Sequence, residues 1–241
     1  MRFMKRKVIK QGNNTLTITL PRKWTSKFGI EVGDEIDVEE QEKTLIISSE
    51  KSIPLSETTL AFHGLNQPLI WRHLTAIYRA GYSTIEVRFD PNSIYENIYT
   101  SFADSSERIK MNAIEVIQDA CNSLIGMEII DQKKDYCIIK DLEEITDKEF
   151  ENTLRRIFLL IKIMGEDSIQ LSKGKSQSLF KKIDITDNNV DRFTDYCLRV
   201  LNKKGYRHFR KTSVMYSIIL VLEYIGDEYK RASMHLLKNK K

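Results

Sequence analysis

Near its N-terminus the chain reads Leu16-Thr17-Ile18-Thr19-Leu20-Pro21-Arg22-Lys23-Trp24. Apolar and polar side chains alternate over the first five of these residues, which is the pattern of a half-buried β-strand that ends at Pro21. The residues after Pro21 predict a short helix from Trp24 to Phe28. Gly29 then closes this helix, because glycine readily adopts the left-handed conformation found after a helix end.

The residues around this stretch predict a small β unit that covers residues 4–48. Gly12 and Gly33 mark turns before and after it, Ile36 and Val38 resume the alternation, and Leu45-Ile46-Ile47 forms a last strand. Four short strands and one turn of helix in about 45 residues bury little apolar surface. We therefore predict that this head pairs with a second copy of itself.

The positive charge of the head is concentrated in its first thirty residues. The first thirty residues contain eight lysines and arginines and no acid, and seven acids then follow between Glu31 and Glu42. The whole chain carries a formal charge of only +4, so the basicity is local. A local positive patch indicates contact with an anionic polymer such as DNA. The alternative is a basic face that only contacts solvent.

The order of these features resembles the AbrB/MazE/SpoVT swapped-hairpin family. The resemblance covers residues 7–48 and rests on Leu20-Pro21-Arg22, the aromatic short helix, Gly29-Ile30 and Gly33-Asp34-Glu35-Ile36. It implies that two chains interleave their hairpins into one β-barrel whose basic residues contact DNA. The residues implied in DNA contact are Lys5, Arg6, Lys7, Lys10, Arg22, Lys23 and Lys27.

The rest of the chain divides into a linker and two further regions. Residues 49–58 form a polar linker that contains Pro54. Residues 59–145 follow the order β-α-β-α-β-β, which predicts a small α/β domain without a catalytic constellation. Residues 146–241 show the helical spacing of three amphipathic helices, which predicts a bundle. We expect a loop over residues 172–178 between the first two helices and a helix end at Gly205. The expected inner positions are Phe150, Leu154, Ile157, Ile161, Met164, Ser168 and Leu171 in the first helix and Val190, Phe193, Cys197 and Val200 in the second. In the third helix we expect Ile218 to face the core, together with Val214, Val221, Ile225 and Ala232.

Two pairs of carboxylates stand out in the predicted bundle. Asp187 and Asp191 are four residues apart at the expected start of the second helix, and Glu223 and Asp227 are four apart in the third. If the two pairs face each other, four carboxylates converge and suit a divalent cation. The alternative is a solvated acidic face. Asp187 would then complement the helix dipole, Asp227 would pair with Arg231, and Glu223 and Asp227 would both face water.

The stretch from Val221 to Arg231 resembles the final helix of the PhoU family, and residues 189–193 resemble the helix before it. About 95 residues match, roughly one of the two bundles usual in that family. The resemblance implies a role in phosphate uptake and a Mg²⁺, Mn²⁺, iron or zinc site on Asp187, Asp191, Glu223 and Asp227. As a whole the chain resembles archaeal-type proteins that join an AbrB-like head to a PhoU-like tail.

These observations predict an α+β protein with a DNA-binding head over residues 1–50, an α/β domain over 59–145 and a helical bundle over 146–241. We expect a cytoplasmic, homodimeric transcription regulator with no membrane insertion and no enzymatic activity. Its tail would sense a signal, a metal or a phosphate-transport or signalling protein. Two alternatives are an adaptor that dimerises through its head without binding DNA, and an antitoxin, which the long folded tail argues against.

Overall fold

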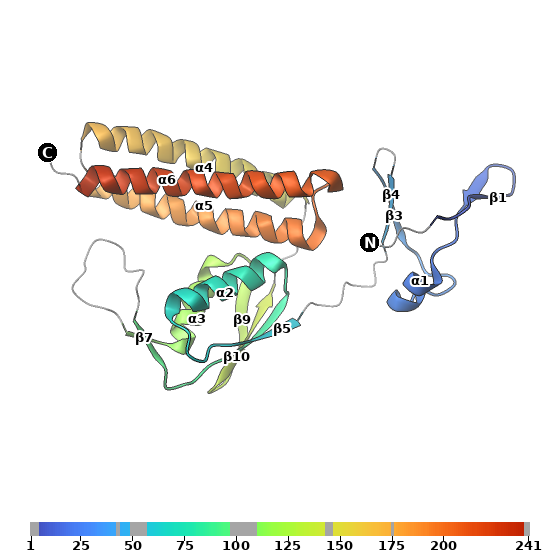
Figure 1. The fold of residues 1–241 in the computed structure, drawn as a ribbon, viewed down its shortest axis with the longest axis horizontal. Helices are drawn as coiled ribbons and strands as arrows, with labels where there is room; N and C mark the ends of the chain where they lie inside the picture. The colour runs from blue at the N-terminus through green and yellow to red at the C-terminus, as the bar shows by residue number, and fades with distance from the viewer. Residues whose placement is uncertain are drawn as a thin grey trace. The chain divides into compact units, whose positions relative to one another are not determined.

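The computed structural model describes residues 5–41, 44–48, 57–96, 110–142, 147–174 and 176–238. The chain divides into two compact units, Met1–Pro54 and Leu55–Lys241. The first unit is the head, and the second contains an α/β layer and a helical bundle (Figure 1). The predicted linker lies mostly outside the described residues, as do residues 143–146 at the expected start of the bundle. None of the helices in the described ranges combines the length and apolar character needed to span a bilayer.

The head consists of two separate hairpins and one short helix. Its elements are β1 (Ile9–Gln11), β2 (Thr15–Thr17), α1 (Arg22–Phe28), β3 (Asp37–Gln41) and β4 (Thr44–Ser48). Antiparallel pairs join β1 to β2 and β3 to β4, with no closed barrel among the described residues of this single chain. Gly29 follows α1 with φ of 61°, so the predicted helix end is confirmed.

The strand predicted over residues 16–20 is shorter than expected, because β2 ends at Thr17. Alternation of apolar and polar residues continues to Leu20, but β1 supplies partners only for Thr15, Leu16 and Thr17. A strand exists only where a neighbouring strand accepts its backbone hydrogen bonds. Within one chain, Ile18 to Leu20 have no such neighbour in the described head.

The α/β layer of the second unit is a four-stranded sheet covered on one face by two helices. Its elements are β5 (Glu57–Ala61), α2 (Gln67–Ala80), β6 (Thr84–Arg88), β7 (Ile94–Glu96), β8 (Lys110–Asn112), α3 (Ala113–Ser123), β9 (Met127–Gln132) and β10 (Tyr136–Asp141). The strand order is β5-β6-β10-β9, with only the first pair parallel, and β7 and β8 form an additional hairpin. Ile85, Val87, Cys137 and Ile139 of the sheet share one core with Leu74 of α2.

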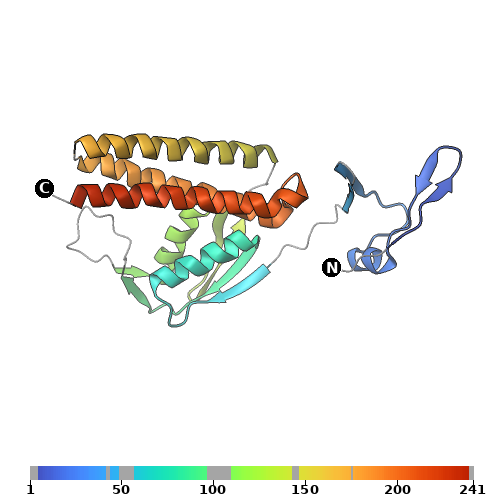
Figure 2. The same cartoon turned by 45° about the horizontal axis from the view of Figure 1, so that its top comes forward.

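Three long helices form the bundle: α4 (Asp147–Lys173), α5 (Gln177–Lys204) and α6 (Thr212–Lys238), with the 3-10 turn η1 (Phe209–Lys211) before α6. They lie side by side in Figures 1 and 2, and α5 also contacts α2 of the α/β layer. The predicted core positions Phe150, Ile157, Met164 and Leu171 of α4 are buried, as are Val190 and Cys197 of α5. The loop expected over residues 172–178 is shorter, since α4 extends to Lys173 and α5 starts at Gln177.

The orientation predicted for α6 is wrong. Ile219 and Leu222 are buried, whereas Ile218, which was expected inside, is exposed together with Val221 and Ile225. Both sets of residues have helical spacing, so periodicity alone does not choose between them. The buried side is the one that packs against α5: a Cβ built on the buried Gly226 would lie 3.4 Å from a methyl group of Val190, which is van der Waals contact.

Candidate functional site

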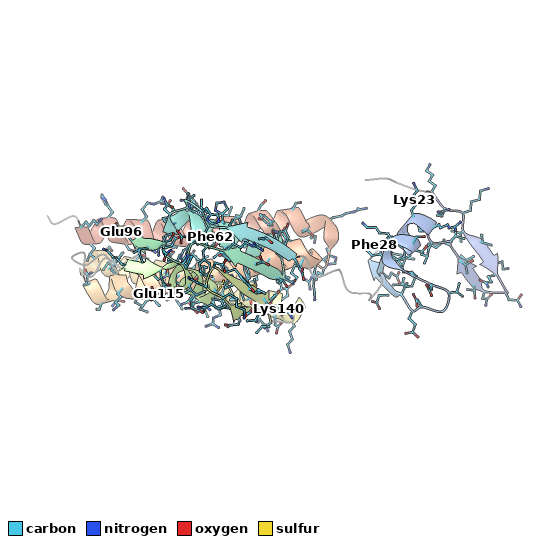
Figure 3. All side chains as sticks on the ribbon, turned by 90° about the horizontal axis from the view of Figure 1, so that it is seen from below. Lys23, Phe28, Phe62, Glu96, Glu115 and Lys140 are labelled. Atoms are coloured by element: carbon cyan, nitrogen blue, oxygen red, sulfur yellow. The ribbon has the colours of Figure 1, made fainter. Side chains whose placement is uncertain are left out.

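The seven basic residues singled out in the head are all exposed. Lys5, Arg6 and Lys7 precede β1, and Lys10 lies in β1. The other three, Arg22, Lys23 and Lys27, lie on α1, where Figure 3 labels Lys23. The described part of the head holds no ion pair of these cations. The Lys27 ammonium instead lies 5.3 Å from the centre of the Phe28 ring. These charges are therefore available to an external anion.

The head has an exposed apolar surface as well. None of its residues whose side chains the structure describes is buried. Leu16 is 71% exposed, and Val8, Ile9, Ile18 and Leu45 are also exposed. Trp24 and Phe28 contact each other along α1, with ring centres 5.8 Å apart. A folded unit needs an interior, and this one has none within a single chain.

The carboxylates singled out in the bundle do meet between α5 and α6. Asp187, Asp191 and Asp227 each bring a carboxylate oxygen within 4.8 Å of the others. Glu223, one turn before Asp227, is close enough to raise the pKa of Asp191. Asp187 lies near the middle of α5, not at its start, and is 1% exposed. The predictions that it complements the helix dipole and that Glu223 and Asp227 face water are therefore wrong.

A lysine that the sequence analysis did not single out neutralises part of this cluster. The Lys230 ammonium lies 2.8 Å from an oxygen of Asp184 and 2.9 Å from Oδ2 of Asp187. Arg231, expected to pair with Asp227, instead pairs with Glu228. Lys230 follows Asp227 by three residues and so lies on the same side of α6. From this spacing the sequence alone could have placed Lys230 near the acids.

The cluster changes how its acids titrate. Burial raises the pKa of Asp191 to about 8, and the nearby carboxylates of Asp187, Asp227 and Glu223 add to the effect. Burial likewise raises the pKa of Asp187, although the hydrogen bond from Lys230 opposes it. At neutral pH the cluster therefore holds a proton on Asp191 in addition to the ammonium of Lys230.

The carboxylates of this cluster suit a metal ion. Three carboxylates supply the oxygen ligands that Mg²⁺ and Mn²⁺ prefer. Oδ1 of Asp187 and Oδ1 of Asp191 are buried and accept no hydrogen bond in the structure. A cation would satisfy both oxygens, so the residues present fit a hard divalent ion. Iron and zinc fit less well, because no histidine or cysteine joins the cluster.

A second buried charge, missed by the sequence analysis, joins α5 to the α/β layer. Arg199 is 1% exposed and donates hydrogen bonds to the carbonyl oxygens of Tyr78 at 2.6 Å and Tyr82 at 2.8 Å. It also contacts the Asp141 carboxylate at 2.6 Å, and Lys203 contacts the same carboxylate at 2.9 Å. Burial alone would raise the pKa of Asp141, but these two cations outweigh it and hold the pKa below its usual value.

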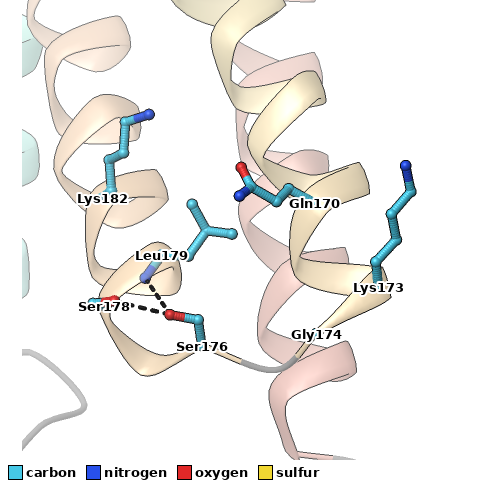
Figure 4. Close-up of a pocket in the computed structure, with 7 residues that line it drawn as sticks. All are labelled: Gln170, Lys173, Gly174, Ser176, Ser178, Leu179 and Lys182. Atoms are coloured by element: carbon cyan, nitrogen blue, oxygen red, sulfur yellow. Dashed lines mark hydrogen bonds between the residues drawn. The ribbon is translucent and has the colours of Figure 1, made fainter.

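A pocket lies where α4 passes into α5 (Figure 4). Its volume is about 540 Å³, and Lys173, Lys182, Ser176 and Ser178 contribute polar atoms to its lining. Lys182 is already paired with Asp167 at 2.8 Å, and Ser176 caps α5 by accepting from the Leu179 amide. The pocket therefore presents few free ligand-binding groups, and we assign it no ligand.

The comparisons with known proteins bear on the head. Neither the curated proteins nor the solved structures compared with the chain gave a match. No family match supports the PhoU resemblance of the tail, which stays a prediction. Residues 9–55 match the family described as "Antidote-toxin recognition MazE, bacterial antitoxin". The head is thus similar to an AbrB/MazE-type domain, a kind of domain that is typically dimeric and binds DNA.

Proposed function

We propose that the protein is a dimeric regulator whose head binds the phosphate backbone of duplex DNA. The observation that carries the proposal is the head itself: seven exposed cations with no ion pair in its described part, on a unit in which none of the described side chains is buried. A second copy would cover the exposed apolar residues and double the positive charge. The match of residues 9–55 to the MazE family supports the same conclusion.

Fluorescence anisotropy on random duplex DNA at several salt concentrations tests the proposal. Each phosphate contact contributes about 0.9 to the slope of log K against log salt. Arg22→Ala combined with Lys23→Ala removes four cations from a dimer and should therefore weaken binding and reduce the slope by up to about 3.6. The matched control is Lys133→Ala with Lys134→Ala, two exposed neighbours between β9 and β10. A wild-type protein that does not bind at low salt would instead support an adaptor that uses its head only to dimerise.

Leu16 offers a separate test of the proposed dimer. It is 71% exposed in the single chain, so Leu16→Asp should be nearly neutral for a monomeric head. In a dimer that buries Leu16, an unpaired aspartate would be placed in the interface and DNA affinity should fall at least tenfold. Val32→Asp serves as the control because Val32 is fully exposed. Equal DNA affinities for the two variants would contradict a head dimer formed through Leu16.

We also propose that the tail senses a signal connected with phosphate uptake, and that Asp187, Asp191, Glu223 and Asp227 bind a divalent cation there. Two buried carboxylate oxygens without a hydrogen bond favour the cation. Isothermal titration with Mn²⁺ should give a binding signal that Asp191→Asn removes. Because Asp191 has to lose its proton first, binding should strengthen as the pH rises through about 8. A titration without heat at pH 9 would overturn the metal site.

A further inference from the structure

The outer face of the bundle carries apolar residues on both sides of the groove between α4 and α6. Two contacts fix how these helices lie. A Cβ built on Gly165 would be 3.1 Å from the hydroxyl oxygen of Tyr229, and the hydroxyls of Ser168 and Ser233 are 2.9 Å apart. Gly165 contacts Tyr229, and Ser168, further along α4, contacts Ser233, further along α6. The two helices therefore run parallel. Gly165 and Tyr229 thus mark the sides of α4 and α6 that meet.

Six exposed apolar side chains lie near this line of contact. On α4, Phe158 and Ile169 are seven residues before and four after Gly165, spacings that return to the same side of a helix. On α6, Ile218 and Ile225 precede Tyr229 by eleven and four residues, and Leu236 follows it by seven. Val221, also on α6, lies slightly further from the line along which the two helices meet. Their exposed fractions run from 36% for Ile225 to 60% for Ile169. We define these six residues as the α4–α6 face.

Charge is scarce around this face. The eleven residues from Thr212 to Leu222 contain no charged side chain. Lys162 pairs with Glu166 on α4, and Glu228 pairs with Arg231 on α6. Glu151, seven residues before Phe158, pairs with Arg207, and the exposed Arg155 lies at the edge of the face. Exposed apolar patches of more than a few hundred Å² are rare on soluble monomers and mark sites of association. A face without net charge favours an equally apolar partner.

We infer that the α4–α6 face binds the same face of a second copy of this chain. The face extends over about 18 residues from Ile218 to Leu236, which at 1.5 Å per residue is about 27 Å, and two helices side by side are about 20 Å wide. That footprint of about 540 Å² per copy, or about 1,080 Å² for the pair, reaches the area of about 1,000 Å² expected of a specific interface. An uncharged face is complementary to itself, as a two-fold symmetric contact requires.

A second copy is also the partner that would be nearby. This step rests on the proposed function, because a dimeric head would hold two tails together and raise their effective concentration. The face itself lies wholly within the tail and does not involve DNA. Pairing of the tails goes beyond the proposed function, since it joins the two bundles directly.

Distances between labels on the full-length protein test the inference. Cys121, Cys137 and Cys197 are buried, so a spin label on Val221→Cys would report on that position alone. Because packed helix axes lie about 10 Å apart, pulsed electron paramagnetic resonance should give a short distance between the Val221→Cys labels of the two copies. Lys134→Cys, in the turn between β9 and β10, should give a longer one. Ile225→Glu in the Val221→Cys background should abolish the short distance, whereas Ile185→Glu, on an exposed residue of α5, should preserve it.

The outcomes separate the inference from the proposed function. A Val221→Cys distance no shorter than that of Lys134→Cys, or a short distance that survives Ile225→Glu, would overturn the pairing of the tails. Circular dichroism would verify that each variant is folded, which we expect because every substituted side chain is exposed. Loss of DNA binding with the short distance intact would count against the proposed function alone. Intact DNA binding with a long distance would count against the tail contact alone.

Discussion

At the scale of single residues, buried charges hold the second unit together and set how it responds to pH. Arg199 joins α5 to the ends of α2 and β10, while Lys230 and the proton on Asp191 neutralise the acids between α5 and α6. Each of these groups has partners that become unsatisfied when it is removed. The direction in which a substitution at one of these positions changes the stability of the fold can therefore be predicted.

Arg199→Met should destabilise the second unit by about 3–5 kcal/mol, because it leaves the Asp141 carboxylate short of a buried partner and two carbonyl oxygens without a donor. Arg199→Lys should also destabilise it, since one ammonium cannot reproduce the planar fork that reaches three oxygens. Urea denaturation followed by circular dichroism measures both. Arg207→Met, on a more exposed arginine, should change stability little.

Asp191 makes the bundle less stable as the pH rises. Its pKa is about 8 in the folded chain against an ordinary value of 3.8, so between these values the folded state binds more protons than the unfolded state. The free energy of unfolding should therefore fall with pH in that window, by at most about 1.4 kcal/mol per pH unit. Asp191→Asn should flatten this dependence and raise stability at pH 9, whereas the exposed Glu166→Gln should do neither. An unchanged slope in Asp191→Asn would assign the effect to another group.

At the scale of elements, sequence patterns located the helices and turns more reliably than the faces of the helices. Gly29 and Gly205 end helices as expected, and α4 buries the predicted inner positions Phe150, Ile157, Met164 and Leu171. In α6, apolar residues cover more than one side, so their periodicity does not identify the buried side. The buried side is set by packing against α5, which contacts α6 at Gly226. The four acids were predicted to converge only if two helices faced each other, a condition that sequence alone does not fix.

The orientation of α6 can be tested with two nearby residues. Leu222 is buried, and Leu222→Ala should cost about 2–5 kcal/mol. Tyr224 is 58% exposed and lies away from the α4–α6 face, so Tyr224→Ala should change the free energy of unfolding by about 0.5 kcal/mol or less. Chemical denaturation gives both values. The reverse order would contradict the orientation of α6 in the structure.

One buried and one half-buried cation explain most of what the sequence analysis missed. Arg199 and Lys230 lie on amphipathic helices, where a lysine or arginine is usually exposed to solvent. Their partners come from other elements: Asp141 from β10 for Arg199, and Asp184 and Asp187 from α5 for Lys230. No local pattern connects residues 58 positions apart, such as Asp141 and Arg199. Tertiary packing, which decides these pairs, is not visible in hydrophobic periodicity.

At the scale of the whole molecule, the two units differ in how much apolar surface each buries within one chain. The second unit has two hydrophobic cores, whereas none of the side chains described in the head is buried. We expect chemical denaturation to resolve two transitions. The head's transition should shift with protein concentration, because association is coupled to its folding. Denaturation monitored at two protein concentrations a hundredfold apart measures this shift, and a head transition that stays fixed would contradict the proposed dimer.

The lack of an interior in the head has a consequence for control in the cell. If the head folds only as a pair, the amount of DNA-binding species at low abundance grows with the square of the number of chains. A twofold drop in synthesis would then reduce operator occupancy about fourfold in the dilute limit, by mass action. Such a protein responds more steeply to its own expression level than a monomeric repressor. A change in gene copy number would then change operator occupancy more than proportionally.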